Sequence, residues 1–399
     1  IDIGGTFSGE ITIEENEVTS DLTIAGIYIE NNGTYEQSNN IPSEGYTLNT
    51  EESTCNNNAS IGWDSKEEEI YVSNLNTTNT ECTLYFDEYN PYAGREYILS
   101  HYDTILTRDD FSITMEETTT GTIYKSLDST QYDSDGEVYY FAGNPTDNWV
   151  QFGGFYWRII RINGDGTIRL IYNGTSTTTT GAETQIGTSA FNSSYNNNAY
   201  VGYMYTTGQV RGLGTNSTIK GVLDSWYQSN LIDYTGKIDT NAGFCGDRTP
   251  STRENTSNGS GGTETTTTYY GTYIRLSYNK TPTFECDNDS DLYTMKESGN
   301  GNKILDYPIG LITADETAYS GGVVGRSNRN YYLYTGQYYW TMSPYAFSAS
   351  YARVFRVYSD GFIDSAGVNT TVGVRPVINL KGSLTLSGSG TSTDPYVVV

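Results

Sequence analysis

The chain has little of the chemistry that most enzyme sites use, because its 399 residues include one histidine, His101, and four cysteines. A Ser-His-Asp or Cys-His site would have to use His101, which lies beside the segment DTILTRDD, and the chain contains no G-x-S-x-G motif. We interpret His101 as an exposed linker residue. The sequence therefore predicts that the chain is not an enzyme.

Positive charge and long hydrophobic runs are also scarce. Lys and Arg number 22 against 48 Asp and Glu, which gives a formal net charge of −26. A surface this acidic repels nucleic acid and anionic membranes. No hydrophobic stretch approaches the roughly 20 residues that a membrane-spanning helix needs. We therefore exclude nucleic acid as a partner and membrane insertion as a property of this chain.

Aromatic residues and turn formers are abundant. The chain has 37 Tyr, 12 Phe, 5 Trp and 43 Gly but 9 Pro, and no long run of helix formers. This composition is typical of short strands joined by many turns. We predict a β-rich α+β fold with one or two helices and long loops.

The cysteines fall into two local groups, Cys55 with Cys82 and Cys245 with Cys286. Neither group has the C-x-x-C spacing of metal or redox motifs. We predict two disulfides, one in each domain, and an extracellular or cell-surface location, because disulfides persist in oxidising compartments.

Patterning divides the chain into four parts. Alternating apolar residues predict a small β-sandwich-like domain over residues 1–88, followed by a connector with one helical turn over 89–117. A larger domain covers 118–381, and a tail over 382–399 ends in one strand. The expected core of the small domain consists of Trp63, Ile70, Val72, Leu75, Leu84 and Phe86.

Three local signals stand out in the larger domain. Two apolar segments flank Asn163-Gly164-Asp165-Gly166, which predicts a β-hairpin. The segment STIKGVLDSWYQSNLIDY predicts a helix capped by Asn216 or Ser217. A shorter helix is expected in TADETAYSGG.

Several segments of the larger domain resemble a known fold. YFAGNPTDNWVQFGGFYWRIIRINGDG, FCGDR, YPIGLITADE, YYWTMSP, ARVFRVYSDG and GVRPVINL are together similar to C-type-lectin-like modules related to the formylglycine-generating-enzyme fold, found in secreted Firmicutes surface proteins. The resemblance covers roughly residues 118–381. It implies that Arg375 anchors the closing strand through backbone and carboxylate bonds. It also implies a structural role for Trp340, Val354, Phe355, Val357, Val374 and Val377.

The enzymatic branch of this fold does not transfer, because formylglycine-generating enzymes use paired cysteines near the end of the domain and no cysteine follows Cys286. The calcium-binding motifs of sugar-binding lectins, Glu-Pro-Asn-like and Trp-Asn-Asp-like, are also absent. The fold therefore implies a displayed binding surface rather than a particular reaction.

The segment Ser343–Pro376 is rich in Tyr, Phe, Ser, Asp and Arg and contains no Lys, Glu, Gln, Trp or Met. Tyr and Arg supply contact area and anchoring, and Ser and Asp supply adaptable hydrogen bonds. This residue usage resembles that of the variable segments in target proteins of diversity-generating retroelements. A static aromatic surface, or the ordinary composition of a β-core, explains the same residue usage equally well. The residues expected on an exposed ligand-binding face are Tyr345, Phe347, Ser348, Ser350, Tyr351, Arg356, Tyr358, Asp360, Phe362, Asp364 and Ser365.

Acidic residues suggest two further sites. Asp287, Asp289 and Asp291 alternate beside Cys286 and could bind Ca²⁺, although a turn capped by Asp side chains explains them as well. Apart from this calcium alternative we predict no cofactor. A polysaccharide hydrolase that uses Asp315 and Glu316 is a less favoured alternative, because spatial pairing of carboxylates is invisible in sequence.

Two functional hypotheses remain. The first is a subunit of an extracellular filament that displays a lectin-like binding face for a glycan or protein. It rests on the strand-like segments IDIGGTFSGEITI and TDPYVVV, which could add to a neighbouring sheet, and on the lack of an anchor in this sequence. The second is an adhesin that binds the same kinds of ligand without polymerising, with each terminal strand paired inside its own domain.

Overall fold

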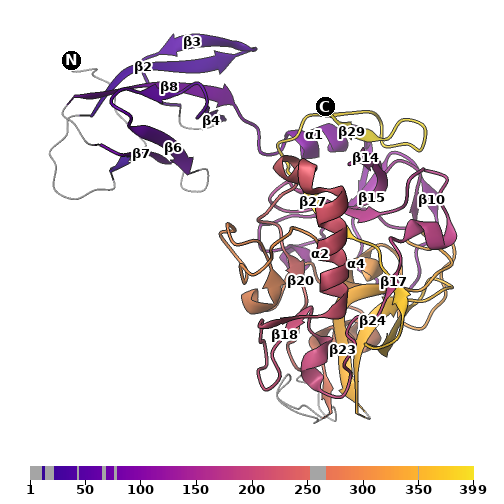
Figure 1. Ribbon diagram of the computed structural model, residues 1–399. Coiled ribbons are helices and arrows are strands. Elements are labelled where there is room, and N and C mark those ends of the chain that lie inside the picture. The colour runs from indigo at the N-terminus through magenta and orange to yellow at the C-terminus, as the bar shows by residue number, and fades with distance from the viewer. Residues whose placement is uncertain are drawn as a thin grey trace. The chain divides into compact units, whose positions relative to one another are not determined.

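The computed structural model describes residues 11–13, 22–42, 45–64, 69–75, 79–251, 267–348 and 350–399. The chain divides into two compact units, Ile1–Asn90 and Pro91–Val399, which are described separately (Figure 1). The predicted β-rich class is confirmed among these residues, since strands dominate both units and helices are few.

The described residues of the first unit form two sheets. One has the order β3-β2-β8-β4 with β5 also paired to β8, and the other has the order β1-β7-β6. β2 and β8 run parallel over most of their length. The strands are β1 (Ile11–Ile13), β2 (Leu22–Asn31), β3 (Thr34–Ser38), β4 (Tyr46–Leu48), β5 (Thr54–Cys55), β6 (Ser60–Asp64), β7 (Glu69–Ser73) and β8 (Thr80–Glu88).

The core of the first unit matches the predicted residues. Ile70, Val72, Leu75, Leu84 and Phe86 are at most 3% exposed, and Trp63 packs against them from a partly buried position. The disulfide Cys55–Cys82 joins β5 to β8, as predicted. Burial of one face of each sheet against a shared core explains why the apolar residues alternate along these strands.

The second unit is built around two larger sheets. Among the described residues the first sheet runs in the order β28-β29-β14-β15-β12-β11-β9, with β16 and β27 continuing from β15. Its strands are β9 (Thr104–Leu106), β11 (Thr122–Lys125), β12 (Tyr139–Tyr140), β14 (Trp149–Phe152), β15 (Phe155–Ile162), β16 (Ile168–Tyr172), β27 (Val377–Leu380), β28 (Leu386–Ser387) and β29 (Tyr396–Val398).

The other sheet has the order β17-β26-β23-β24-β25, with β21 paired to β23. Its strands are β17 (Thr188–Ser189), β21 (Thr268–Tyr269), β23 (Tyr339–Ser348), β24 (Tyr351–Val357), β25 (Ile363–Gly367) and β26 (Val372–Gly373). Short strand pairs join β10 (Thr118–Thr119) to β13 (Asn144–Pro145), β18 (Met204–Tyr205) to β19 (Thr215–Asn216) and β20 (Phe244–Cys245) to β22 (Leu292–Tyr293).

The predicted hairpin and both predicted helices are present. Asn163–Gly166 joins β15 to β16. The longest described helix is α2 (Thr218–Asn230), and the Ser217 hydroxyl caps it by accepting a hydrogen bond from Lys220 N. The remaining helices are α1 (Ala93–Leu99), α3 (Gly271–Ile274), which continues into a π-helical turn over Arg275–Asn279, and α4 (Ala314–Tyr319).

The predicted connector and tail are not separate parts, which corrects the boundaries at 117 and 381. α1 donates a hydrogen bond from Gly94 N to Gly382 O, and β9 pairs with β11. The tail strand β29 pairs with β14 and β28 inside the second unit. Both segments bury apolar surface against the same core, so they fold with the larger unit.

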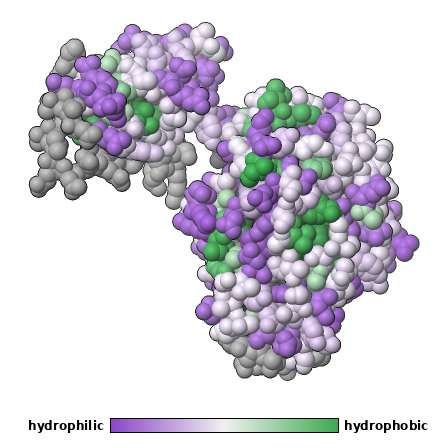
Figure 2. Space-filling view, in the orientation of Figure 1, coloured by the Kyte–Doolittle hydropathy of each residue, from purple (hydrophilic) through white to green (hydrophobic). Residues whose placement is uncertain are grey.

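One large cluster of buried apolar residues and two smaller ones form the core of the second unit, as far as the structure describes it. Trp340, Val354, Phe355, Val357, Val374 and Val377 are at most 1% exposed, in agreement with their predicted structural role. Arg375 is fully buried and donates hydrogen bonds to Tyr172 O, Leu333 O and Asn173 Oδ1. It therefore anchors the closing strand through backbone groups as expected, but its side-chain acceptor is an amide instead of a carboxylate. On the face of this unit shown in Figure 2, hydrophobic residues form separate patches in a largely polar surface.

Candidate functional site

The residues predicted to form one exposed face are divided by the fold. Phe347 and Ser365 are 1% and 5% exposed, so both belong to the interior, and their assignment to a binding face is wrong. The pairing of β23 with β24 shifts register on both sides of Pro344. Such bulges break the two-residue alternation of a strand, so sequence parity did not predict which side chains face solvent.

Tyr345 is half-buried in a cluster of aromatic rings beside α3. Its ring contacts Tyr273 and Phe355 edge-on, at centroid distances of 4.8 and 5.0 Å. Burial raises the pKa of its hydroxyl. We infer that Tyr345 contributes mainly to packing between β23 and α3.

Tyr351, at the start of β24, is 46% exposed. Its ring stacks on Tyr195 with the centroids 4.8 Å apart. Ser350 is also exposed, whereas Ser348 is half-buried in the strand pair. This end of β24 therefore presents an exposed pair of tyrosine rings. Tyr351 was predicted from the sequence as a binding residue, whereas Tyr195 was not.

A second aromatic surface lies at the other end of β24. We call Tyr338, Arg356, Tyr358 and Phe362 the aromatic face. The Arg356 guanidinium carbon lies 4.7 Å from the Tyr338 ring centroid and 5.2 Å from that of Tyr358. Phe362 stacks on Tyr358 with the centroids 4.5 Å apart. All four side chains are partly exposed.

Two acidic residues near the aromatic face accept hydrogen bonds. Asp364 on β25 accepts a hydrogen bond from Arg356 Nη2 over 3.2 Å, which orients the guanidinium between the two tyrosines. Asp360 accepts a hydrogen bond from the Ser327 hydroxyl over 2.7 Å. The ion pair with Asp364 thus holds the Arg356 guanidinium in one orientation between the tyrosine rings.

A tight turn brings Tyr358 and Phe362 together. Tyr358 N donates to Phe362 O, and Gly361 N donates to Tyr358 O. Gly361 has φ +87°, and a Cβ at this position would lie 1.7 Å from Asn328 O. Only glycine fits here without moving the backbone.

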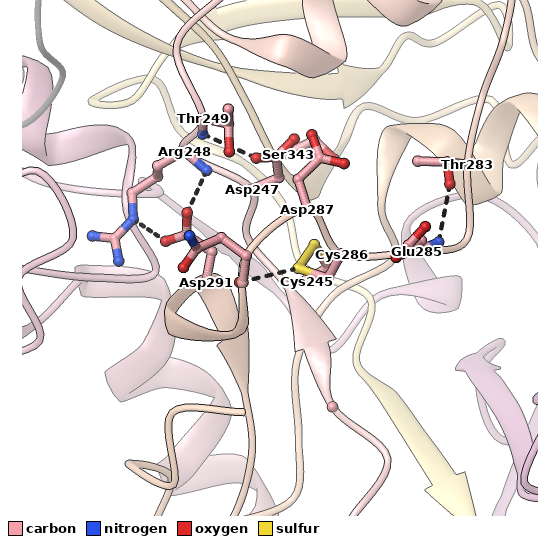
Figure 3. The surroundings of a disulfide bond; sticks show 12 residues. Cys245, Asp247, Arg248, Thr249, Thr283, Glu285, Cys286, Asp287, Asp291 and Ser343 are labelled. Atoms are coloured by element: carbon pink, nitrogen blue, oxygen red, sulfur yellow. Dashed lines mark hydrogen bonds and ion pairs between the residues drawn. A yellow bond between two sulfur atoms is a disulfide. The ribbon is translucent and has the colours of Figure 1, made fainter. Parts of the chain in front are cut away.

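The second unit also contains a cavity of about 120 Å³ beside the Cys245–Cys286 disulfide. Figure 3 shows Asp247, Asp287 and Ser343 above this disulfide, with Arg248 and Asp291 to its left. The disulfide was predicted, but the cavity was not. Its wall is mainly polar and charged, and two networks of buried ion pairs form much of it.

The first network joins two strands of the large sheet to α4. Glu316 Oε1 lies 2.5 Å from Arg169 Nε and 3.0 Å from Arg161 Nε. Arg161 also pairs with Asp133 over 3.4 Å. Burial opposes ionisation of Glu316, but the charges of Arg169 and Arg161 outweigh it and lower the pKa of this carboxyl group. Glu316 also completes a capping box with Thr313 at the start of α4.

The second network centres on Arg275, in the π-helical turn. Its guanidinium pairs with Asp247 over 3.0 Å, with Asp315 over 3.1 Å and with Asp287 over 3.2 Å. Burial raises the pKa of Asp315 despite the nearby guanidinium. Asp315 and Glu316, the pair considered for a hydrolase, are therefore each engaged with arginine. The prediction that the chain is not an enzyme stays a prediction.

The three aspartates considered for calcium lie in different surroundings. Asp291 is fully buried and binds Arg211 and Arg248 over 2.8 and 2.7 Å. Asp287 joins the Arg275 network, and Asp289 is exposed. Within the described ranges, no three or more Asp, Glu, His or Cys side chains form a group that could hold a metal ion. The structure therefore does not bring this triplet together as calcium ligands.

His101, the single histidine, is not among the residues that line this cavity. It follows α1, and its ring contacts those of Tyr97 and Tyr396 at 4.9 and 5.7 Å. It is half-buried rather than exposed, which corrects the sequence interpretation. Its packing places it in the contact between α1 and the C-terminal strand.

Sequence reasoning missed the buried arginines of the large sheet. Arg161 and Arg169 are 8% and 1% exposed on strands whose other residues are mainly apolar. Guanidinium groups in a segment such as GGFYWRIIRINGDGTIRLIY are a usable signal, because a charged side chain in a buried strand needs a carboxylate or other hydrogen-bond acceptors as partners. The partner itself, Glu316, is not identifiable from the local sequence.

Comparison with known proteins adds one match. Residues 251–382 match a domain of unknown function, DUF6273. This segment contains the aromatic face, Arg275 and α4. No curated protein and no solved structure matches the chain.

Two further observations concern the disulfides and the helices. The two disulfides are typical of a protein that folds in an oxidising environment. None of the described helices is long and apolar enough to cross a membrane.

Proposed function

We propose that the chain is an extracellular recognition protein that binds a glycan or protein ligand through the aromatic face, on a C-type-lectin-like scaffold. The observation that carries this proposal is the position of Arg356, which Asp364 holds between Tyr338 and Tyr358 at a partly exposed surface. Tyrosine and arginine dominate the strongest contacts of protein interfaces. The apolar faces of sugar rings also stack on aromatic rings.

Preorganisation supports a binding role over a purely structural one. Arg356 Nε and Asp360 Oδ1 are buried and have no hydrogen-bond partner among the described residues. Such buried groups are costly to leave unpaired. The exposed Tyr195–Tyr351 pair at the opposite end of β24 supplies a second aromatic contact point.

The proposal is tested by comparing the wild-type protein with an Arg356→Ala/Tyr358→Ala variant. Binding is measured to an array of defined glycans and to intact cells before and after protease treatment, which separates glycan from protein ligands. We expect the variant to bind at least about 30-fold more weakly, because truncating a central hot-spot residue costs about 2 kcal/mol or more.

The control is Tyr234→Ala, which removes a tyrosine that is 39% exposed and lies outside the aromatic face. The control should bind as the wild type does. Equal binding by all three proteins, with the variant folded as judged by circular dichroism, would refute the proposal.

Assembly into a filament stays a prediction. In the structure β1, which is the described end of IDIGGTFSGEITI, pairs with β7, and β29 pairs with β14. Residues 1–10 of the first segment lie outside the described residues. The adhesin alternative is compatible with this pairing. Electron microscopy of the purified protein at high concentration distinguishes the two, because filaments would be visible without knowledge of the ligand.

A further inference from the structure

The cavity beside the Cys245–Cys286 disulfide carries more negative charge than its arginines neutralise. The arginines of its wall are engaged in the two ion-pair networks described above. Four other carboxylates of the wall form no ion pair with any residue that the structure describes, namely those of Asp135, Asp165, Glu285 and Asp289. An occupant of this cavity is therefore expected to be positively charged.

A buried oxygen in the cavity wall also lacks a donor. Asn163 is 5% exposed, and its Nδ2 donates to Thr167 Oγ1 over 2.7 Å and to Asn379 Oδ1 over 3.3 Å. Its Oδ1 accepts no hydrogen bond among the described residues.

The neighbouring bonds fix this orientation of the Asn163 amide. Thr167 uses its hydroxyl proton to donate to Asp165 Oδ1 over 2.6 Å, so it can only accept from Asn163. Asn379 Oδ1 also accepts a hydrogen bond from Arg169 Nη1. Because both neighbours act as acceptors, the amide must present its NH₂ group to them, and its oxygen is left without a donor.

Asp165 adds a second acceptor at the same turn. Both hydrogen bonds that it receives from Thr167, from the backbone N and the hydroxyl, end on Oδ1, so Oδ2 accepts none from the described residues. Burial raises the pKa of Asp165 to about 6, and the charges of Asp239 and Asp135 add to the effect. The carboxylate thus lies in a place that lacks a compensating cation.

We propose that this cavity binds an alkylammonium group, which donates to Asn163 Oδ1 and pairs with the carboxylates of Asp165 and Asp135. An ammonium group supplies three N–H donors and one positive charge in a compact shape. The cavity volume of about 120 Å³ exceeds the roughly 10–15 Å³ that one water requires, so it accommodates this group with part of its alkyl chain. The source is either a small free amine or a lysine side chain of a polypeptide.

The test titrates the full chain with 1,4-diaminobutane and, separately, with an oligolysine peptide, using isothermal titration calorimetry at low salt. We expect binding of at least one of them, and no binding of 1,4-butanediol, which matches the diamine in length but carries no charge. The Asp135→Asn/Asp165→Asn variant should bind about tenfold more weakly or worse, because it loses two nearby charges.

The matched control is Glu183→Gln, which removes one charge from an exposed position outside the cavity wall. It should bind the amines as the wild type does. Binding of the diamine identifies a free amine as sufficient, whereas binding of oligolysine alone identifies a polypeptide source; both results support the proposal when the double variant weakens binding.

Three results would overturn it: no binding of either amine, equal binding of the diol, or an equal loss in Glu183→Gln and the double variant. Displacement of the bound diamine by equimolar CaCl₂ would also overturn it, since the cavity would then be a metal site. The side-chain amide resonance of Asn163 in the wild-type protein gives a readout that does not depend on any variant. It should shift on addition of the amine, and an unchanged resonance at saturation contradicts the assigned contact.

Discussion

Replacing Glu316 by Gln should destabilise the second unit strongly, because it removes the charge that neutralises buried Arg169. Arg169 is 1% exposed, and its guanidinium has no other carboxylate within ion-pair distance among the described residues. Its remaining acceptors are Gly243 O and Asn379 Oδ1, at 3.1 and 3.3 Å. Arg161 keeps Asp133 as a partner over 3.4 Å, so it is partly compensated.

The expected loss is about 3–5 kcal/mol in the free energy of unfolding, which is the usual cost of removing one partner of a buried ion pair. Gln retains the size of Glu and can replace it in a capping box, so the loss reports mainly on charge. A Thr313→Ala variant removes only the cap of α4 and should cost about 1 kcal/mol.

Denaturant unfolding followed by tryptophan fluorescence measures this difference, since four of the five tryptophans lie in the second unit. The pKa of Glu316 is lowered in the folded protein, so its contribution is present above its ordinary value of 4.5 and is lost as pH falls through the folded pKa. The gap between wild type and variant should therefore narrow in acid. A loss no larger than that of Thr313→Ala, or a gap independent of pH, would refute this account of the network.

Three further predictions concern other parts of the second unit. Gly361→Ala should destabilise the unit by about 2–4 kcal/mol in thermal unfolding and abolish ligand binding, because the new Cβ meets a backbone oxygen. The control Gly325→Ala, at φ +73° with open space around it, should cost about 1 kcal/mol in the same assay. Replacing Cys245 and Cys286 by Ser opens a loop of 41 residues and should cost about 4 kcal/mol relative to the oxidised wild type in denaturant unfolding. The difference should vanish when both proteins are measured under reducing conditions. Asp165→Asn should stabilise the protein by about 1–2 kcal/mol at pH 7.5 and by almost nothing at pH 4. The reason is that the pKa of Asp165 is raised to about 6, so keeping this carboxyl ionised above pH 6 costs free energy in the folded state. Equal effects at both pH values would contradict this prediction.

Local signals predicted local structure well. The Asn163–Gly166 hairpin, the Ser217 cap of α2 and the start of α4 all depend on residues within a few positions of one another. The disulfide pairs were also predictable, because each joins cysteines of one local group. Domain boundaries were less accurate, since α1 and β29 are held by contacts with distant strands.

The candidate sites were only partly predictable. Composition indicated an aromatic binding surface, and Arg356, Tyr358 and Phe362 do lie together, but Tyr338 was not assigned to it. Phe347 and Ser365 were assigned to the surface and are buried. Bulges beside Pro344 change which side chains of β23 face the core, whereas Ser365 lies on β25, whose pairing with β24 is regular. The cavity and its charge imbalance had no counterpart in the sequence reading.

By itself the sequence determined the β-rich class, the turns, the helix caps, the disulfide pairs and the acidic character of this protein, because these properties follow from composition and from the backbone preferences of neighbouring residues. Tertiary structure alone decided that Arg161 meets Glu316, 155 positions away, and that Asn163 is left with an unsatisfied oxygen. The physical reason is that a buried charge or amide takes its partners from whichever elements pack against it, and that packing is a property of the whole fold.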